Sequence, residues 1–485
     1  MKSKLLKSFF DKVNGWSEQI AIIDQNNQSY TFNQLLKSTV FSQQVLNQKK
    51  VKKGQIAIVA VPMSFELYPI LYALLTKGIT AVFLDPWFSR KQMNQLIGEL
   101  NPSIIIVDHQ FKWLLALLPQ SWFTSKWIVK GLGEKDPPLE IEDMDESDTA
   151  LVTYTSGSSG KPKGANRTYA FLEAQINALT GYLKREQSTR DYTNFPIVGL
   201  GTLYFGNTLV IPKIKLKSID QANPVSIINQ VKESNASRLI VSPAILEKAN
   251  TRRLASIHEI ITGGSPLLEN VAKKTLDLYD DITLTNLYGS TESEPIASTD
   301  FNAFVENFNQ PEKGLLAGKV YSLTQLKIVA INDPSIELQE EEIGEIIVTG
   351  NHVNKSYFRN QQAFHENKIE DSKGEVWHRT KDTGYLKNGL LYLVGTVSRT
   401  IHHSGQAYHP FIVENQIRQI FGITDLAYYQ KEGQVYLKYH SSQTSNEKLQ
   451  NWLMESQYPI DVIVATDEPL PKDPRHRGKI DIKAL

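Results

Sequence analysis

The sequence contains no cysteine among its 485 residues. This absence excludes disulfide bonds, thiolate zinc sites, iron–sulfur clusters and a cysteine nucleophile. If such a protein makes a thioester, the sulfur must come from a partner molecule. An excess of charge of one sign is also lacking, because 52 lysines and arginines balance 52 aspartates and glutamates. We therefore expect no whole-chain electrostatic attraction to nucleic acid or to an anionic bilayer.

A long hydrophobic run is lacking as well. The most apolar stretch, residues 56–84, is interrupted by Pro62, Glu66, Pro69 and Lys77, and a membrane span needs ~20 apolar residues. The N-terminal residues combine lysines with few apolar side chains, which predicts an amphipathic helix rather than a secretory signal. We expect a cytoplasmic protein without integral membrane association. Its hydrophobic share, 41%, is sufficient for a globular core.

Short apolar runs alternate with helical stretches in the first third of the chain. The predicted strands are 55–61, 80–85, 103–108 and 126–129, and helices at 65–78 and 89–100 lie between them. This alternation is typical of a parallel sheet with crossover helices, and it recurs between residues 223 and 289. From about residue 319 the pattern changes to short strands and turns, which predicts a small β-rich subdomain.

The sequence predicts an α/β fold class with two domains. We expect a large N-terminal domain of parallel α/β sheets over residues 1–394, which includes the β-rich subdomain. A hinge is predicted at residues 395–398. Residues 399–485 are expected to form a small, mobile α+β C-terminal domain.

One loop has a composition that suits a polyphosphate. Leu151–Ala165 reads LVTYTSGSSGKPKGA, in which glycines let backbone N–H groups approach an anion while hydroxyls and lysines add donors and charge. It is not a Walker A loop, because Thr155 and Pro162 stand where that motif needs glycine and a hydroxyl residue. The alternative is a flexible linker, although linkers rarely join a buried strand to clustered lysines. The predicted phosphate-binding residues are Thr155, Ser156, Gly157, Ser158, Ser159, Gly160, Lys161, Lys163 and Gly164.

Further segments appear in the order typical of one enzyme superfamily. After TSGSSGKPKG come GGSPL at 263–267, YGSTE at 288–292, TKDTGYL at 380–386, a loop at Gly405 and LPKDPRHRGKI at 470–480. Together they resemble the AMP-forming acyl-adenylate superfamily of acyl-CoA synthetases, peptide-synthetase adenylation domains and luciferases. The resemblance implies a reaction in two halves: a carboxylate and ATP form acyl-AMP and pyrophosphate, and a thiol then displaces AMP.

The resemblance implies a role for each matching residue. Thr291 would hydrogen-bond the adenylate phosphate, and Glu292 would help to hold Mg²⁺. Asp382 would accept from both ribose hydroxyls. Lys479 would bring positive charge to the substrate carboxylate and the α-phosphate, a contribution on the order of 10²–10³ in rate. Gly264, Ser265 and Tyr288 are expected around the adenine, and Gly289 is also expected to bind the nucleotide. The alternative interpretations are a solvated loop acid for Glu292, a turn aspartate for Asp382 and a solvated tail lysine for Lys479.

The hinge motif departs from the superfamily pattern. Thr396, Ser398 and His402 stand where relatives often carry arginine, aspartate and lysine. We expect Ser398 to serve as the hinge residue, and Arg399 is a candidate for the missing ribose-contacting charge. Lys381 also replaces a glycine. Two adjacent histidines at 402 and 403 are not expected to share a metal, because neighbouring strand residues point to opposite faces.

The acyl side also departs from the pattern, because FPIVG at 195–199 lacks the histidine of P-L-F-H. The apolar, glycine-spaced segment favours an apolar acid, and the predicted acyl-pocket residues are Phe195, Pro196, Val198 and Gly199. With the serine hinge and the tail from Asp473, the chain looks similar to the fatty-acyl-CoA-ligase-like branch that includes olefin-pathway β-lactone synthetases.

We therefore predict an acid–CoA ligase of the long- or medium-chain fatty acid type, with ATP, Mg²⁺ and coenzyme A as cofactors and co-substrates. Its expected partners are small molecules, with an acyl carrier protein as a further possibility and no nucleic acid. Three alternatives remain: a carrier-protein thiol as acceptor, closure of a β-lactone by an internal hydroxyl, and a nucleotide-binding protein that has lost turnover.

Overall fold

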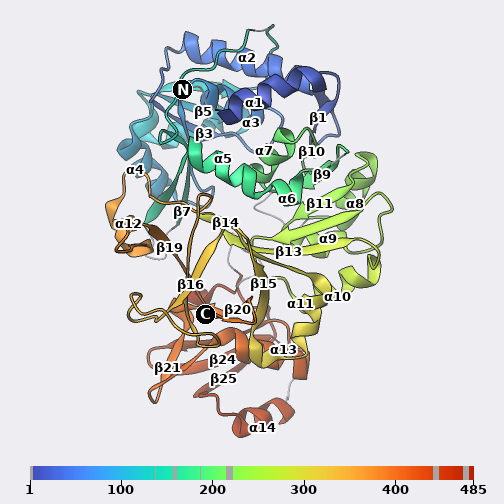
Figure 1. The fold of residues 1–485 in the computed structure, drawn as a ribbon, viewed down its shortest axis with the longest axis vertical. Helices are drawn as coiled ribbons and strands as arrows, with labels where there is room; N and C mark the ends of the chain where they lie inside the picture. The colour runs from blue at the N-terminus through green and yellow to red at the C-terminus, as the bar shows by residue number, and fades with distance from the viewer. Residues whose placement is uncertain are drawn as a thin grey trace.

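A computed structural model describes residues 4–136, 138–156, 161–185, 187–214, 222–440, 447–472 and 480–485. Figure 1 shows a large N-terminal domain and, at the other end of the molecule, a smaller C-terminal domain. The predicted fold class is confirmed. The exact domain boundaries stay a prediction.

The first sheet has six strands in the order β6–β5–β3–β4–β7–β8. Their bounds are β3 Ile56–Ala60, β4 Thr80–Phe83, β5 Ile104–Asp108, β6 Ser125–Val129, β7 Thr149–Ser156 and β8 Pro162–Thr168. All neighbours are parallel except β7 and β8, which form an antiparallel hairpin. The sheet contains every strand predicted in the first third of the chain.

The second sheet is the larger of the two in the N-terminal domain. The described residues contribute fourteen strands, in the order β16–β17–β19–β20–β15–β14–β13–β12–β11–β9–β10–β1–β2 with β18 beside β19. The strands of its parallel half, with the β2 hairpin strand, are β1 Ile20–Ile23, β2 Ser29–Thr31, β9 Arg190–Thr193, β10 Thr208–Val210, β11 Arg238–Val241, β12 Glu259–Gly263 and β13 Thr283–Ser290. The antiparallel half consists of β14 Ser293–Asp300, β15 Leu315–Val320, β16 Gln325–Val329, β17 Gly344–Thr349, β18 Lys368–Glu370, β19 Val376–Lys387 and β20 Leu390–Thr396. The predicted β-rich subdomain is therefore hydrogen-bonded into the parallel sheet rather than standing apart from it.

Helices cover the sheets in the N-terminal domain. They are α1 Lys4–Val13, α2 Phe32–Gln48, α3 Leu67–Thr76, α4 Arg90–Leu100, α5 Tyr169–Ala178, α6 Thr180–Leu183, α7 Pro196–Tyr204, α8 Pro224–Glu233, α9 Pro243–Ala249, α10 Glu269–Leu278, α11 Phe301–Phe308 and α12 Gln361–Asn367. Short 3₁₀ helices are η1 Asn14–Trp16, η2 His109–Leu117, η3 Pro119–Ser121, η5 Pro311–Lys313 and η6 Val397–Arg399. Local sequence sets several ends: Ser89 and Gln92 form a capping box at the start of α4, and Gly78 follows α3 with φ +64°.

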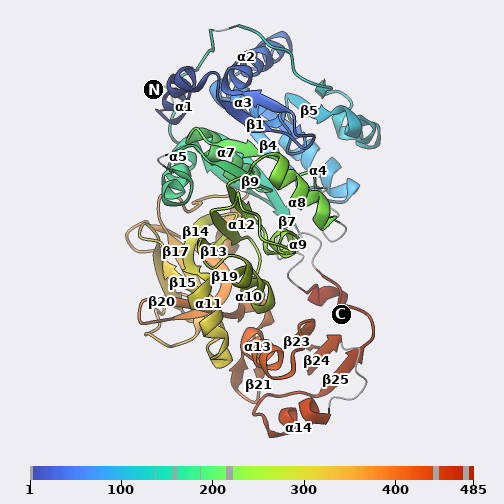
Figure 2. The same cartoon turned by 90° about the vertical axis from the view of Figure 1, so that its right-hand side faces the viewer.

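Alternating residues place the first sheet between two apolar layers. Ala57 and Val59 of β3 pack into the cluster that contains α1, α2 and α3, whereas Ile56 and Ile58 pack into the cluster that contains α4. Strand residues two apart share a face, so one short strand serves both layers. Figure 2 shows these helices on the two sides of the sheet.

The C-terminal domain has its own core. Its elements are β21 Ile401–His403, β22 Gln406–Tyr408, α13 Pro410–Phe421, β23 Leu426–Lys431, β24 Gln434–His440, α14 Glu447–Glu455, β25 Val462–Thr466 and η7 Ile482–Ala484. Val413 and Ile417 of α13 pack on Tyr428 and Leu437 of the β23–β24 hairpin. Across the described part of the chain, no helix combines the length and the apolarity that crossing a membrane requires.

Candidate active site

The predicted phosphate loop lies at the tip of the β7–β8 hairpin. The register pairs Thr155 with Lys163, which places Lys163 at the carboxyl end of the parallel strand β7. Ligands in open α/β sheets bind outside this end of the strands. Lys161 is exposed, and Gly164 lies buried on β8. Ser156 closes β7. The predicted residues Gly157–Gly160 lie outside the described residues, and so does Lys479.

Lys163 connects the loop to a buried polar cluster. Its Nζ lies 3.4 Å from Glu292 Oε1. It also donates to Tyr357 Oη at 3.3 Å and to Asn367 Oδ1 at 3.2 Å. The Tyr357 hydroxyl in turn donates to Glu292 Oε1 at 3.0 Å. Two residues that the sequence predicts for ATP and Mg²⁺ are thus brought together by a tyrosine that it did not predict.

Buried charge determines the protonation state of Glu292. Burial alone raises the pKa of its carboxyl group. The neighbouring groups His378, Lys163 and Lys368 and the Tyr357 hydroxyl outweigh burial and lower this pKa to about 2. Glu292 is therefore an anion at neutral pH although its side chain is buried.

Lys368 is the most unusual cation of the cluster. It is buried at the start of β18, and its Nζ donates to the backbone carbonyl of Asn354. Burial lowers its pKa from 10.5 to about 7, against the attraction of Glu292. Burial likewise lowers the pKa of His378 to about 3, so this imidazole is neutral at pH 7 and the lysines supply the positive charge.

Arg167 holds the predicted catalytic Thr291 in place. Its guanidinium donates to the Thr291 backbone carbonyl at 2.9 Å and to the Thr153 hydroxyl of β7. The Arg167 side chain is buried, and burial lowers its pKa while the carboxylates Glu292 and Glu294 raise it. This arginine therefore lies in the electrostatic field of two carboxylates and links β8 to the turn between β13 and β14.

The predicted adenine and ribose residues also converge. The Tyr288 hydroxyl donates to Asp382 Oδ2 at 2.7 Å, and Gly289 follows Tyr288 on β13. Gly264, with φ +81°, and Ser265 follow β12, where only glycine adopts this backbone conformation readily. A Cβ atom on Gly264 would lie 3.4 Å from Phe195 Cε1, so this loop borders the predicted acyl pocket.

The hinge residues lie beside Asp382, but Arg399 points elsewhere. The β19–β20 register pairs Asp382 with Thr396, the position of the missing arginine. Thr396 Oγ1 lies 3.5 Å from Ser398 Oγ. The Arg399 guanidinium forms an ion pair with Glu414 of α13 and donates to the Tyr428 carbonyl at 3.2 Å. A ribose contact by Arg399 stays a prediction, and it would require this ion pair to open.

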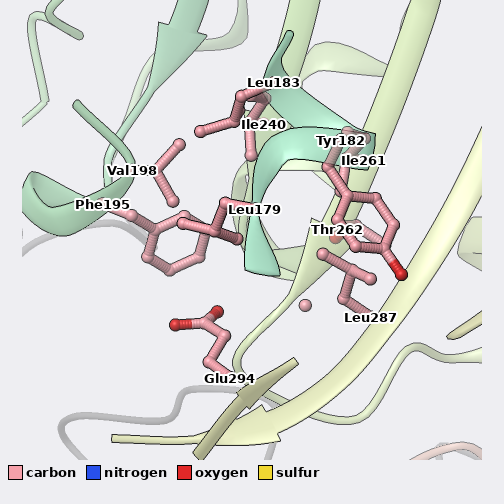
Figure 3. Close-up of a pocket in the computed structure, with 11 residues that line it drawn as sticks. Leu179, Tyr182, Leu183, Phe195, Val198, Ile240, Ile261, Thr262, Leu287 and Glu294 are labelled. Atoms are coloured by element: carbon pink, nitrogen blue, oxygen red, sulfur yellow. The ribbon is translucent and has the colours of Figure 1, made fainter. Parts of the chain in front are cut away.

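Two of the four predicted acyl residues line a small pocket. Figure 3 shows Phe195 and Val198 facing Leu179 and Leu287 across it. The lining is apolar except for Thr262, Tyr182 and the carboxylate of Glu294. The sequence analysis did not predict Glu294. Burial raises the pKa of Glu294, and Arg167 opposes this shift. No hydrogen bond to the Glu294 carboxylate comes from any residue that the structure describes.

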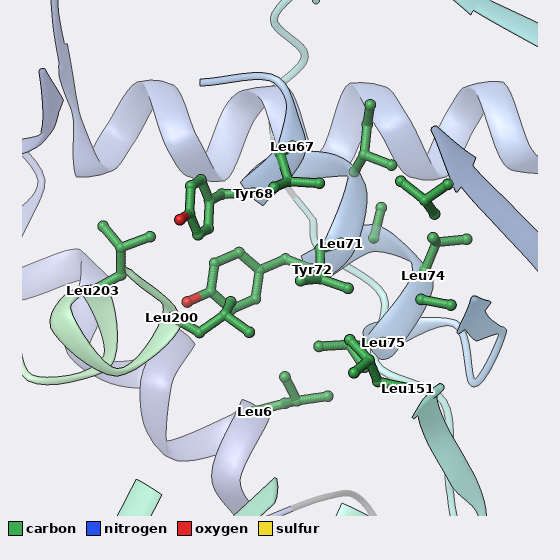
Figure 4. Packing of buried hydrophobic residues seen from close by; sticks show 14 of the residues in the cluster. Leu6, Leu67, Tyr68, Leu71, Tyr72, Leu74, Leu75, Leu151, Leu200 and Leu203 are labelled. Atoms are coloured by element: carbon green, nitrogen blue, oxygen red, sulfur yellow. The ribbon is translucent and has the colours of Figure 1, made fainter. Parts of the chain in front are cut away.

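Pro196 and Gly199 face the opposite side of α7, toward Tyr68. The Tyr68 hydroxyl donates to the Pro196 carbonyl at 3.4 Å. A Cβ atom on Gly199 would lie 2.1 Å from Tyr68 Oη, so the tyrosine occupies the space that a histidine at this position would need. Figure 4 shows Tyr68 and Tyr72 of α3 packed beside Leu200 and Leu203 of α7. Tyr68, more than a hundred residues earlier in the chain, thus fills the space that the side chain of a histidine at position 199 would occupy.

The buried site fits a magnesium ion carried by ATP. One oxygen of Glu292 accepts the Tyr357 hydroxyl, whereas Oε2 accepts no hydrogen bond from the described residues. Mg²⁺ is usually held by one or two carboxylates, phosphate oxygens and water. The described residues contain no cluster of three His, Asp or Glu side chains that could hold a metal alone. We expect Glu292 to hold the ion together with phosphate, and the ion would neutralise phosphate charge.

Sequence reasoning missed Tyr357, Lys368, His378, Arg167 and Glu294. None lies in a glycine-rich or hydroxyl-rich motif, and each reaches the site from a different strand or loop. Only the position of Glu294, two residues after Glu292, offered a local signal.

Comparisons with known proteins identify the family and the fold of this chain. The model of the AMP-binding enzyme family matches residues 9–358. An olefin beta-lactone synthetase of Stenotrophomonas maltophilia is 26% identical over 409 residues, which cover 78% of this chain and 74% of that protein. The 2-succinylbenzoate–CoA ligase of Bacillus subtilis is 28% identical over 417 residues, 82% and 79% of the two chains. ATP-bound MatB from Rhodopseudomonas palustris shares the fold, with a TM-score of 0.84 over 100% of this chain and 98% of that chain at 17% identity.

Proposed function

The chain belongs to the AMP-binding enzyme family, and from this premise we propose that it is an ATP-dependent acid–CoA ligase for an apolar, fatty-type carboxylic acid. A carboxylate oxygen of the acid attacks the α-phosphorus of ATP, and pyrophosphate leaves. The thiol of coenzyme A then attacks the acyl carbon, and AMP leaves. The CoA ligase among the relatives supports this acceptor.

The observation that carries the proposal is the convergence of the buried Glu292 with Lys163 and Thr291 at the carboxyl end of β7. Two anions must meet in the first half-reaction, so preorganised positive charge lowers the barrier. Lys163 is fixed by three polar contacts rather than free in solvent. Thr291 is held by Arg167, and we assign the ribose hydroxyls to Asp382, whose Oδ2 also accepts from the Tyr288 hydroxyl. Lys479 completes the proposed catalytic set.

We assign the domain boundary to residues 395–398. The C-terminal core starts at Ile401, and Arg399 is already anchored on α13, so the residues left to absorb a domain rotation precede it. Ser398 is the proposed hinge residue. This assignment allows the C-terminal domain to present different surfaces in the two half-reactions.

A second candidate acceptor is a hydroxyl within the acid itself, which would attack the acyl carbon, release AMP and close a β-lactone. One observation favours it: Glu294 places a carboxylate in a mainly apolar pocket, beside Thr262 and Tyr182, where it could take the hydroxyl proton. The similarity to an olefin beta-lactone synthetase points the same way. A carrier-protein thiol remains a further acceptor of the same chemical type.

The decisive experiment is acid-dependent ATP–pyrophosphate exchange without CoA, over short, medium and long fatty acids, 3-hydroxy acids, aryl acids and amino acids. We expect exchange with apolar acids. Glu292→Gln should lose it, whereas Glu340→Gln, which changes an exposed carboxylate on the same domain, should keep it. ATP binding without exchange across the whole panel would refute turnover and leave a nucleotide-binding protein.

The acceptor is then tested with the best acid. Product formation that requires free CoA supports the ligase, and AMP release from a 3-hydroxy acid without any thiol supports β-lactone closure. Glu294→Gln separates the two: it should lower thiol-independent turnover by ~10-fold or more while leaving CoA transfer of an unsubstituted acid nearly unchanged. Equal loss of both activities would show that Glu294 serves only the structure of the pocket.

A further inference from the structure

The exposed aromatic side chains of this protein are concentrated in one short segment. Among the residues that the structure describes, every exposed phenylalanine and tryptophan lies between residues 111 and 123. Trp113 is 55% exposed, Trp122 57% and Phe123 99%. Phe111, Leu117 and Ile128 are also exposed. Scattered apolar residues are normal on a protein surface, but such a concentration marks an interaction site.

Buried leucines and hydrogen bonds anchor this segment with its exposed aromatic side chains outward. Leu115 and Leu118 are buried in the apolar layer under α4 and anchor η2 and η3. Residues three apart share a face of a 3₁₀ helix, so Phe111 and Leu117 project from one side of η2. The turn that carries Trp122 and Phe123 is fixed by Lys126, whose Nζ donates to the carbonyls of Trp122 and Thr124 at 3.0 Å.

The charge of the segment is positive. Lys112, Lys126 and Lys130 are its charged residues between 110 and 130, and no acidic residue lies in that stretch. Of the nearest acids on either side, Asp136 is paired with a lysine, whereas Asp108, Glu99 and Glu134 have a histidine or a glutamine amide as partner and keep their negative charge. Asp108 lies 3.4 Å from His109 Nδ1, and Asp136 pairs with Lys37 at 3.0 Å. Glu99 of the adjacent α4 accepts from Gln95 at 2.7 Å, and Glu134 accepts from Gln34 at 3.2 Å.

We propose that residues 109–130, the aromatic edge, dock the enzyme on an anionic lipid bilayer. Trp and Phe beside lysines are the side chains that partition into a membrane interface, and each lysine adds attraction to anionic headgroups. Phe123 has almost no contact with its own chain, so a fluid bilayer accommodates it more readily than a preformed protein pocket does.

The position of the aromatic edge fits docking during catalysis. β6 is the terminal strand of the first sheet, and Figure 2 shows this side of the N-terminal domain beside β5, remote from the C-terminal domain. Docking there leaves the C-terminal domain free to move. The inference does not depend on which acid or acceptor the enzyme uses.

The test is co-sedimentation of the full-length protein with vesicles of phosphatidylcholine alone and of phosphatidylcholine mixed equally with phosphatidylglycerol. We expect binding to the anionic vesicles that weakens as salt is added. Trp122→Ser with Phe123→Ser should lower the partition coefficient by ~10-fold or more. Met454→Ser, which removes an exposed apolar side chain of α14, should leave it unchanged.

A charge variant guards against a folding defect in the aromatic variant. Lys112→Gln with Lys130→Gln should weaken binding to anionic vesicles by roughly 10-fold or more, with no change on neutral vesicles. Equal sedimentation of wild type and both variants would overturn the proposal. So would a wild-type dimer in solution that dissociates in the Trp122→Ser, Phe123→Ser variant, since a second copy would then cover the aromatic edge.

Discussion

Replacing Lys368 by methionine should raise the free energy of unfolding of the protein and reduce the stabilisation that MgATP gives. Methionine fills a similar volume without a charge. Lys368 is only 4% exposed, so water solvates its charge little. The carboxylate Glu292 keeps two partners in the variant, because Lys163 and the Tyr357 hydroxyl both remain.

The magnitude follows from the pKa of Lys368, which burial lowers from 10.5 to about 7. Below pH 7 the folded protein holds a proton that the unfolded chain binds more tightly. At pH 6 the difference between the unfolded-state pKa of 10.5 and the folded-state pKa of about 7 lowers the free energy of unfolding by about 5 kcal/mol, at 1.36 kcal/mol per pKa unit. This pKa already contains the attraction between Lys368 and Glu292, and the lost bond to the Asn354 carbonyl offsets part of the gain. We expect Lys368→Met to raise the free energy of unfolding by about 2–3 kcal/mol at pH 6.

The pH dependence gives a sharper signature than the magnitude. Between pH 7 and 10.5 the unfolded wild type binds more protons at Lys368 than the folded wild type does. The free energy of unfolding of the wild type therefore gains a contribution that rises with pH in this window. The Lys368→Met variant lacks that contribution, so the two stability curves should converge toward pH 10.

The assay is urea unfolding from pH 6 to pH 10, with and without MgATP. MgATP should stabilise the wild type more than the variant, because phosphate compensates the buried charge. Lys355→Met is the matched control: its ammonium pairs with Glu375 at the surface, and a change within about 1 kcal/mol is expected. A Lys368→Met variant that is less stable than the wild type at pH 6 would refute the reasoning from burial.

Three further predictions concern the contacts around the site. Tyr357→Phe removes the 3.0 Å bond to Glu292 and should cost about 2 kcal/mol in urea unfolding at pH 7. It should also raise the pKa of Glu292, so that the loss of stability on acidification still begins near pH 4.5 but ends above the wild-type limit of about pH 2 and is smaller in total, which an acid titration would reveal. Gly199→Ala should cost about 1–3 kcal/mol in the same urea assay, and adding Tyr68→Phe should recover part of it; no recovery would mean that Tyr68 is not the obstacle. Asp382→Ala should raise the KM for ATP more than the KM for the acid in steady-state kinetics, and equal changes would count against a ribose contact.

Sequence patterns predicted the elements whose stability is local. The strand predicted at 103–108 and the helix predicted at 89–100 follow from apolar periodicity, and the structure has them at 104–108 and 90–100. Gly422 ends α13 in the left-handed conformation, which glycine adopts readily. These signals lie within a few residues of the structure they specify, so a single sequence is enough to read them.

The remaining parts of the site depend on contacts between distant segments. Lys368 and Tyr357 reach Glu292 across 76 and 65 sequence positions, and neither belongs to a motif. The direction of Arg399 depends on Glu414, whose carboxylate is buried only because α13 packs on β23. Tyr68 excludes a side chain at Gly199 through a packing contact that no local pattern encodes. Periodicity reports which face is apolar, not which distant groups meet on it.

The second sheet also constrains how the chain folds during synthesis. β1 at Ile20–Ile23 pairs with β10 at Thr208–Val210, so the first strand of the chain emerges from the ribosome long before its parallel neighbour. At typical rates of synthesis the delay is roughly 10–40 s. β15 is likewise synthesised before its neighbour β20 at Leu390–Thr396. Until then the nascent chain exposes unpaired strand edges, which can pair with other chains and so favour aggregation during synthesis.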